Sequence, residues 1–385
     1  MTDLLDALGA HSDQMRAWRH HMHRHPELAF EESKTAAFIS ALLRGWGYDV
    51  EEGVGGTGVV ASMRNGASER AIGLRADMDA LPIHEANTSD HRSQVEGRSH
   101  MCGHDGHSAM LLGAARHLAE TRNFNGTVRL LFQPAEEVMG GALAMMRDGL
   151  FERFPMEAVF GMHNMPGLEQ GKLFFTPGPI MAAVDNWEIV LTGKGGHGSM
   201  PEKARDTVVA GSSLVMALQT IVSRNVAAKD SAVLTVGAFL AGEAGNVIAH
   251  SATLRLSVRT TTPETRKFVL DRIRKIARAQ SESYDVACEI REGAPDAVLV
   301  NDPVETERCA EIARSVVGDE NVVAPGPTFM GSEDFAFFSE RAPCNYCFIG
   351  NGDTPMVHHP CYDFDDRNLA IGAAYWVALV ESRLR

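Results

Sequence analysis

Residues 99–108 concentrate side chains that bind metal ions. Their sequence, Ser-His-Met-Cys-Gly-His-Asp-Gly-His-Ser, contains one thiol, three imidazoles and one carboxylate. Cys and His bind borderline-soft divalent ions, and the spacing of Cys102 and His104 lets one turn present both donors. Histidine-rich loops also occur as solvated surface segments, so this stretch alone leaves two interpretations open.

Three apolar segments elsewhere in the chain each end in acids or a histidine. They are residues 71–75 before Asp77 and Asp79, residues 127–132 before Glu136 and Glu137, and residues 157–162 before His163. A helix-like stretch, residues 108–120, separates the first two. Strands that alternate with helices favour a mostly parallel sheet, in which ligand groups collect beyond the carboxyl ends of the strands. The sequence therefore predicts a metal site at that edge of a sheet.

The pattern changes at about residue 184. A strand, a helix, two strands, a helix and a strand follow one another at residues 184–191, 204–224, 232–240, 252–260, 264–281 and 284–291. The order βαββαβ is that of the split βαβ, or ferredoxin-like, motif. We therefore expect an α/β fold in which a discontinuous catalytic domain (residues 1–183 plus 295–385) carries an inserted domain (residues 184–294).

Length and composition agree with this division. A chain of 385 residues exceeds the roughly 250–300 residues at which one hydrophobic core stops growing. The net charge of −14 argues against general nucleic-acid binding and against docking on an anionic membrane. We find no secretion signal, no apolar run long enough to span a bilayer and no disulfide pattern in the six cysteines, so we expect a cytoplasmic protein.

Two other groups are interpreted as structural. Cys344 and Cys347 have the spacing of a redox motif, but their apolar surroundings are typical of a buried strand. Residues 19–27 contain four histidines, and no carboxylate or thiol follows at close ligand spacing. We interpret this stretch as a basic, solvated segment that leads into a turn at Pro26.

Nine motifs together resemble a known family. They are HRHPELAFEE, LRADMDALPI, HMCGHDGHSAMLLGAA, LLFQPAEE, GMHNMPGLEQG, GKGGHGSMP, GNVIAH, MGSEDFAFF and HHPCYDFDD. In this order, and over nearly the whole chain, they resemble the M20 metallopeptidase family, in particular its amidohydrolase branch of hippurate hydrolases, N-acyl-amino-acid deacylases and indole-acetyl-amino-acid hydrolases. The resemblance implies a zinc-peptidase-like catalytic domain with two divalent ions, and an inserted lid domain that mediates dimerisation.

The resemblance also implies a role for each matching position near the ions. The implied metal ligands are Cys102, His104, Glu137, His163 and His358, the implied general base is Glu136, and the implied orienting carboxylate is Asp79. His359 is the alternative to His358. Asp77 stands where other branches carry a histidine ligand, and His100 and His107 are expected to support the ligands.

Further implied roles fall in the inserted domain. His197 is implied to reach the active site of the dimer partner and to stabilise the oxyanion of the reaction. Asn246 and Arg259 are implied to bind the carboxylate of the substrate. The acyl pocket is not defined by any motif, although Met139, Phe175 and Met181 are candidates to line it.

These residue types suit amide hydrolysis. Two ions about 3.5–4 Å apart can activate a water and polarise a carbonyl group. Glu136 would take the proton of that water and pass it to the leaving amine, while Glu137, its neighbour on a strand end, would project the other way and bind metal. We therefore predict a dimetal enzyme that cleaves acetyl-, benzoyl- or aryl-acetyl-amino acids into a carboxylic acid and a free amino acid.

Several features stay open. The ions are zinc, manganese or cobalt. We expect a homodimer that binds small-molecule substrates, or a tetramer made of two such dimers, with neither nucleic acid nor membrane as a partner. The alternatives are a dipeptidase or aminopeptidase on the same scaffold, a non-catalytic metal-binding protein, and a hydrolase with Cys102 as the nucleophile.

Overall fold

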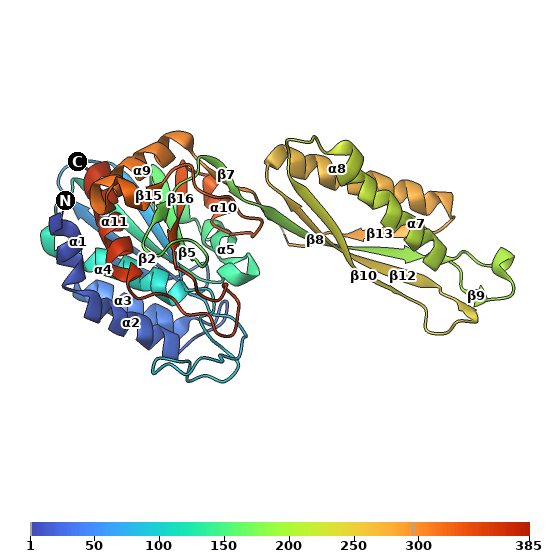
Figure 1. Ribbon diagram of the computed structural model, residues 1–385, viewed down its shortest axis with the longest axis horizontal. Helices are drawn as coiled ribbons and strands as arrows, with labels where there is room; N and C mark the ends of the chain where they lie inside the picture. The colour runs from blue at the N-terminus through green and yellow to red at the C-terminus, as the bar shows by residue number, and fades with distance from the viewer. Residues whose placement is uncertain (1, 295) are drawn as a thin grey trace. The chain divides into compact units, whose positions relative to one another are not determined.

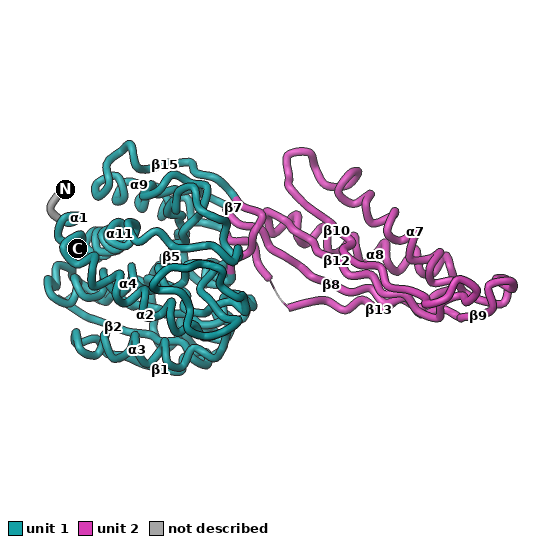
Figure 2. Tube along the Cα trace, turned by 60° about the horizontal axis from the view of Figure 1, so that its bottom comes forward, with its two compact units in different colours: residues 1–178, 300–328, 334–385 teal, residues 179–299, 329–333 magenta. Residues whose placement is uncertain are grey.

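The computed structural model describes residues 2–294 and 296–385 (Figure 1). The chain forms two compact units (Figure 2): unit 1 is Met1–Gly178, Val300–Thr328 and Asp334–Arg385, and unit 2 is Pro179–Leu299 and Phe329–Glu333. Unit 1 is thus assembled from both ends of the chain. The predicted domain bounds, 1–183 plus 295–385 and 184–294, stay a prediction about folding domains.

Unit 1 is built on a sheet that has eight strands among the described residues. In spatial order they are β1 (Asp49–Val54), β2 (Gly58–Asn65), β4 (Gly126–Gln133), β3 (Ala71–Asp77), β5 (Ala158–Met165), β16 (Cys344–Gly350), β6 (Leu173–Phe174) and β15 (Val322–Val323). Strand β3 pairs in parallel with β4 and β5, and β5 pairs in parallel with β16. The predicted mostly parallel sheet is confirmed, and its central strands end at one edge.

Helices cover both faces of this sheet. One face packs against α1 (Thr2–Gly9), α2 (Ser12–Arg24), α3 (Ser33–Gly45), α4 (His104–Thr121), α9 (Pro303–Val317) and α11 (Asn368–Arg383). Every second residue of a strand points to this face, as do Val128, Leu130 and Phe132 of β4. The remaining helical segments of unit 1 are η1 (Glu136–Val138), α5 (Gly141–Arg147), α6 (Leu150–Arg153), η4 (Asp319–Asn321) and α10 (Ala336–Ser339).

Unit 2 has an antiparallel sheet with strand order β10 (Ala232–Ala241), β12 (Ser251–Thr260), β8 (Ala183–Thr192) and β13 (Ala287–Arg291). Helices α7 (Thr207–Thr220) and α8 (Pro263–Ser283) pack on it through a separate apolar core. The chain order β8-α7-β10-β12-α8-β13 is the expected βαββαβ arrangement. The other short elements are β7 (Gly178–Met181), β9 (Gly196–His197), η2 (Pro201–Lys203), η3 (Ile221–Asn225), β11 (Val247–Ile248) and β14 (Leu299–Asn301).

The starts of three helices follow from local sequence. Asp206, Thr262 and Asp302 each precede a helix, and each side chain accepts hydrogen bonds from backbone N–H groups of the first turn. Proline follows Thr262 and Asp302, where its fixed φ suits the first helical position. These caps fix where α7, α8 and α9 begin.

Two expectations about apolar segments need correction. One helical stretch, Thr207–Asn225, is long and apolar enough by length and composition to cross a membrane, although no such run was expected. Its Leu214 and Leu218 are buried in the core of unit 2. Phe175 is fully buried in the core of unit 1, so it does not line an open acyl pocket. Cys344 and Cys347 do lie in a buried strand, as predicted.

The close contact between β5 and β16 gives a test of the core. Gly161 lies on β5, where an added Cβ would overlap the buried ring of Tyr346 on β16. Gly161→Ala should therefore lower the free energy of unfolding by about 1–3 kcal/mol, measured by urea denaturation. Gly45→Ala is the matched control, because nothing lies within 4 Å of its Cβ position. Equal stability of the two variants would contradict this packing.

Candidate metal centre

The Cys102-Gly103-His104 turn depends on its glycine. Gly103 has φ 97°, and a Cβ there would overlap the side chains of Asn164 and Tyr362. Helix α4 begins at His104, four residues earlier than the sequence predicted. Because residue 103 has no side chain, the chain can turn here. The Cys102 thiol then lies just before helix α4, and the His104 imidazole lies in the first turn of that helix.

The structure brings the five expected ligands together in two groups. Cys102, His104 and His163 form one, and Cys102, Glu137 and His358 form the other; within each group the candidate donor atoms lie within 4.8 Å of one another. The Cys102 Sγ is 3.4 Å from His163 Nε2, and Glu137 Oε2 is 3.2 Å from His358 Nε2. Cys102 belongs to both groups, so its sulfur would be available to an ion held by either one.

The two buried imidazoles have a defined orientation. His104 Nδ1 donates to the backbone carbonyl of Asp79 at 2.9 Å, and His163 Nδ1 donates to the carbonyl of Asn164 at 2.5 Å. A carbonyl oxygen only accepts, so each Nδ1 carries the proton and each Nε2 keeps a lone pair. This is the arrangement that metal-binding histidines adopt in proteins.

Two buried polar atoms fit a cation. His104 Nε2 and Glu137 Oε1 have no hydrogen-bond partner among the described residues. An unsatisfied buried polar atom costs about 1–3 kcal/mol, more if it is charged. A divalent ion would satisfy the lone pairs of both atoms, so this donor set fits a two-ion centre.

Asp79 connects His104 of the first ligand group with Glu137 of the second. Its Oδ1 lies 3.1 Å from His104 Nδ1, and its Oδ2 accepts the backbone N–H of Glu137 at 3.0 Å. One carboxylate thereby orients a histidine ring and holds the turn that carries the two glutamates. This contact is what an orienting carboxylate requires.

The two glutamates do not lie as predicted. Residues 136–138 form a 3₁₀ turn, flanked by Ala135 and Met139 at φ 54° and 55°. Glu136 Oε2 is 4.0 Å and Glu137 Oε1 is 3.8 Å from His104 Nε2. The expectation that they project to opposite sides is wrong, because strand alternation ends before residue 136. Both carboxylates therefore reach the same histidine.

The environment of Cys102 argues against a cysteine nucleophile. Burial, followed by the negative charges of Glu137, Glu136 and Asp77, raises the pKa of this thiol well above its usual range. Only a thiolate attacks, and these surroundings disfavour the thiolate unless a cation opposes the carboxylates. Cys102 is thus better suited to bind metal than to attack a substrate alone.

Asp77 lies beside the ligands but is occupied by other partners. Its carboxylate binds Arg75 Nη1 at 2.7 Å and His107 Nδ1 at 2.6 Å. Burial alone would raise the pKa of Asp77, but the charges of His104, Arg75 and His107 outweigh it and hold the pKa well below its usual range. His107 Nε2 in turn accepts the backbone N–H of Asn164 at 3.0 Å, so this group supports the strand end that carries His163.

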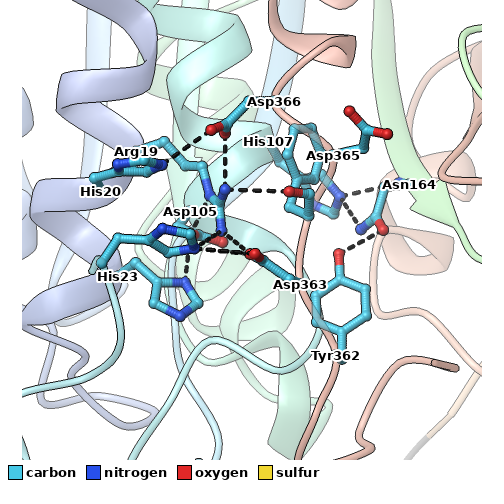
Figure 3. A network of polar contacts seen from close by, with 12 residues as sticks. Arg19, His20, His23, Asp105, His107, Asn164, Tyr362, Asp363, Asp365 and Asp366 are labelled. Atoms are coloured by element: carbon cyan, nitrogen blue, oxygen red, sulfur yellow. Dashed lines mark hydrogen bonds and ion pairs between the residues drawn. The ribbon is translucent and has the colours of Figure 1, made fainter. Parts of the chain in front are cut away.

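The histidine-rich segment was interpreted wrongly at two positions. Helix α2 continues to Arg24, and Arg19 and His23 are buried rather than solvated. In Figure 3, Arg19 points into a group of carboxylates: its Nε donates to Asp105 Oδ2 at 3.0 Å, its Nη1 to Asp366 Oδ1 at 2.7 Å, and its Nη2 to Asp363. The helical spacing of Met15, Trp18 and Met22 is the signal that places both residues on the buried face.

This network joins three separate segments. His23 Nδ1 lies 2.8 Å from the same Asp105 oxygen that Arg19 binds. Asp105 follows His104 directly, and Asp363 and Asp366 follow His358 in the loop after β16. Helix α2 therefore anchors both the start of α4 and the C-terminal loop that comes after His358.

Two other histidines, His359 and His100, belong to none of the candidate ligand groups found in the described residues, whereas His107 forms one with Asp77 and His104. His359 Nδ1 accepts the backbone N–H of Cys361 at 3.0 Å, which favours His358 over its neighbour. His100 is buried, and burial lowers its pKa to about 4. His100 therefore belongs to the surroundings of the centre.

The remaining predicted residues lie in unit 2. His197 on β9 pairs with Val247 on β11, and Gly198 N–H donates to the carbonyl of Asn246 at 2.8 Å, so His197 and Asn246 belong to neighbouring turns. Arg259 donates to the backbone carbonyl of Met330. The roles of His197, Asn246 and Arg259 in binding or catalysis stay predictions.

Comparison with known proteins identifies the family. The family described as peptidase family M20/M25/M40 matches residues 73–382. The chain belongs to this family. Hippurate hydrolase of Campylobacter jejuni is 44% identical over 367 residues, which cover 95% of this chain and 96% of that protein. N-acetyl-L-cysteine deacetylase of Bacillus subtilis is 37% identical over 96% of this chain and 88% of its own.

A solved structure agrees with this assignment. A dinuclear metal-binding peptidase of family M20 from Bacillus subtilis has a TM-score of 0.86 and 31% identity, and the match covers 98% of this chain and 99% of that one. The expected amidohydrolase branch of the family is confirmed by these relatives. As a member of that branch, the M20 protein described here is a hydrolase that acts on linear amide bonds.

The Arg19 network should affect metal binding. Arg19→Met leaves three carboxylates without their shared cation, and we expect apparent zinc affinity, measured by chelator competition, to fall roughly 10–100-fold. Arg266→Met is the matched control, since Arg266 Nε binds Asp185 at 2.8 Å in unit 2. Both variants should lower Tm, and only the first should weaken zinc binding. Equal zinc affinity would show that the network is structural only.

His23 should make stability depend on pH. Burial would lower its pKa, but Asp105 and hydrogen bonds to Asp105 and Glu85 raise the pKa from 6.5 to about 9. Its stabilising effect is therefore complete below pH 6.5 and is lost as pH rises to about 9. The difference in unfolding free energy between wild type and His23→Gln should shrink by about 1 kcal/mol per pH unit in this window. A difference that is independent of pH in urea titrations would contradict this assignment.

Proposed function

We propose that this protein hydrolyses the amide bond of N-acyl-amino acids, with two divalent ions bound by Cys102, His104, Glu137, His163 and His358. The observation that carries the proposal is the pair of ligand groups that share Cys102 and lie beside Glu136. Similarity to a hippurate hydrolase and to an N-acetyl-L-cysteine deacetylase supports an acyl-amino acid as the substrate class. Zinc, manganese and cobalt all suit these donors.

Bound ions would supply Lewis acidity for the carbonyl group and lower the pKa of the attacking water. Glu136 is the proposed general base. Its Oε2 lies 4.0 Å from His104 Nε2, and its side chain is largely buried. It would accept a proton from the attacking water and deliver it to the leaving nitrogen.

Neighbouring residues would prepare Glu136 for this task. The backbone of Glu137 is held by Asp79 at 3.0 Å, which restricts the turn that carries both glutamates. His104 is oriented by the same aspartate. Rigid placement matters because a general base must stay within hydrogen-bond reach of the proton that it removes.

Further parts of the proposal concern unit 2. His197 would stabilise the oxyanion from the partner subunit of a homodimer, with unit 2 as lid and dimerisation domain. Asn246 and Arg259 would bind the free carboxylate of the amino acid. The amide side chain and the guanidinium are the donor types that recognise a carboxylate. A cytoplasmic location also stays part of this proposal.

The test is a substrate panel: N-acetyl-, N-benzoyl- and indole-acetyl-amino acids together with free dipeptides, with and without a chelator. Acyl-amino acids should be hydrolysed, chelation should abolish the activity, and Glu136→Gln should lower kcat by about 10²–10⁴-fold. Metal content separates the roles, because Glu136→Gln should keep two ions per chain and Cys102→Ala should lose them.

Other outcomes would change the assignment. Hydrolysis of dipeptides alone would keep the centre and replace the substrate class by that of a metallopeptidase. Full activity in Glu136→Gln with bound metal would remove Glu136 as the base. No hydrolysis with any of the three metals would favour a non-catalytic metal-binding protein.

A further inference from the structure

Strained backbone collects around the candidate centre. Among the described residues, six non-glycine residues have positive φ, and four of them are Phe30 (62°), Ala135 (54°), Met139 (55°) and His358 (68°). Ala135 and Met139 flank the turn of Glu136 and Glu137, and His358 is a candidate ligand. Left-handed backbone in residues with a side chain is typical of functional sites. Phe30 is the one of these four for which no role has been given.

Hydrogen bonds on both sides of Phe30 in the sequence hold its segment to the centre. Upstream, the carbonyl of Glu27 accepts the N–H of Ala80, the residue after Asp79, at 2.8 Å. Downstream, Glu32 Oε1 accepts the N–H of Ala135, the residue before Glu136, at 2.8 Å. The short segment that carries Phe30 is thereby held against both segments that supply catalytic carboxylates.

Phe30 forms an apolar surface with Val138. Both side chains are solvent-exposed, by 46% for Phe30 and 55% for Val138. A Cβ added at Gly56 or at Gly140 would lie 3.4 Å from the Phe30 ring. A Cβ added at Gly140 would also lie 3.7 Å from Val138 Cγ2. The two side chains thus lie on either side of Gly140, three residues after Glu137. Burial does not explain why an aromatic residue keeps a disfavoured φ here.

We propose that Phe30 and Val138 form the binding surface for an apolar, preferably aromatic, acyl group of the substrate. The inference rests on the proposed function and specifies its substrate. The amino-acid end of such a substrate carries a carboxylate, which the proposed function assigns to Asn246 and Arg259. The neutral acyl end carries no charge and gains from contact with an exposed ring and a branched side chain. The Phe30–Val138 surface therefore suits the acyl side of the scissile bond.

The test compares N-benzoylglycine with N-acetylglycine, which differ only in the acyl group. Phe30→Gly should lower the ratio of their kcat/KM values roughly tenfold, and Val138→Ala should lower it by a few fold. Val304→Ala is the matched control, because Val304 has the same exposure as Val138, 55%, but lies on α9. Its ratio should equal that of wild type.

Stability distinguishes binding from a structural role. Glycine adopts a φ of 62° without strain, so Phe30→Gly should keep or raise Tm while the ratio falls. A purely structural Phe30 would instead lower Tm and reduce both kcat/KM values equally, which would overturn the inference. If wild type hydrolyses both substrates and neither variant changes the ratio, only this inference fails. If wild type hydrolyses neither, the proposed function fails.

Discussion

The carboxylate of Asp79 is the contact on which the centre depends. It lies just beyond the carboxyl end of β3, and it binds a ring nitrogen of His104 on one side and the backbone of Glu137 on the other. Parallel pairing of β3 with β4 brings these segments to one edge, because both strands end there. Without this link, the start of α4 and the glutamate turn would be positioned independently. The link thus positions one donor of each ligand group, His104 in the first and Glu137 in the second.

A centre rich in carboxylates also has to be balanced by buried cations. Arg75 is fully buried and donates to Asp77 at 2.7 Å and to Asp334 at 3.1 Å, and Arg19 binds Asp105 in the first turn of α4. Buried ion pairs return little net stability, but a buried charge without its partner is strongly destabilising. Here the two arginines hold the carboxylates in place, because each guanidinium binds several carboxylates at once and has a planar, fixed geometry.

The features that depend on short stretches of chain could be predicted from the sequence. The strands before Asp79, Glu136 and His163, the Cys102–His104 turn and the βαββαβ order all follow from local patterns, and the structure has them. The sequence did not predict the partners of Arg19, since Asp105, Asp363 and Asp366 are distant in sequence. The directions of the two glutamates were also missed. A 3₁₀ turn held from outside by Glu32 and Asp79 leaves no pattern in its own residues.

Assembly of the centre requires both ends of the chain. His163 lies on β5 before unit 2, and it is paired in register with Phe348 on β16, after unit 2. His358 follows β16, and the hydrogen bond from its backbone N–H to the carbonyl of Met101, at 2.6 Å, brings it back to the Cys102 turn. More than a hundred residues of unit 2 separate these strands in sequence, so their pairing carries a loop-closure cost. A cation held by Cys102, Glu137 and His358 would join the two ends of the chain directly. Metal binding and the closing of unit 1 should therefore be thermodynamically linked, since the second ligand group exists only once β16 has docked.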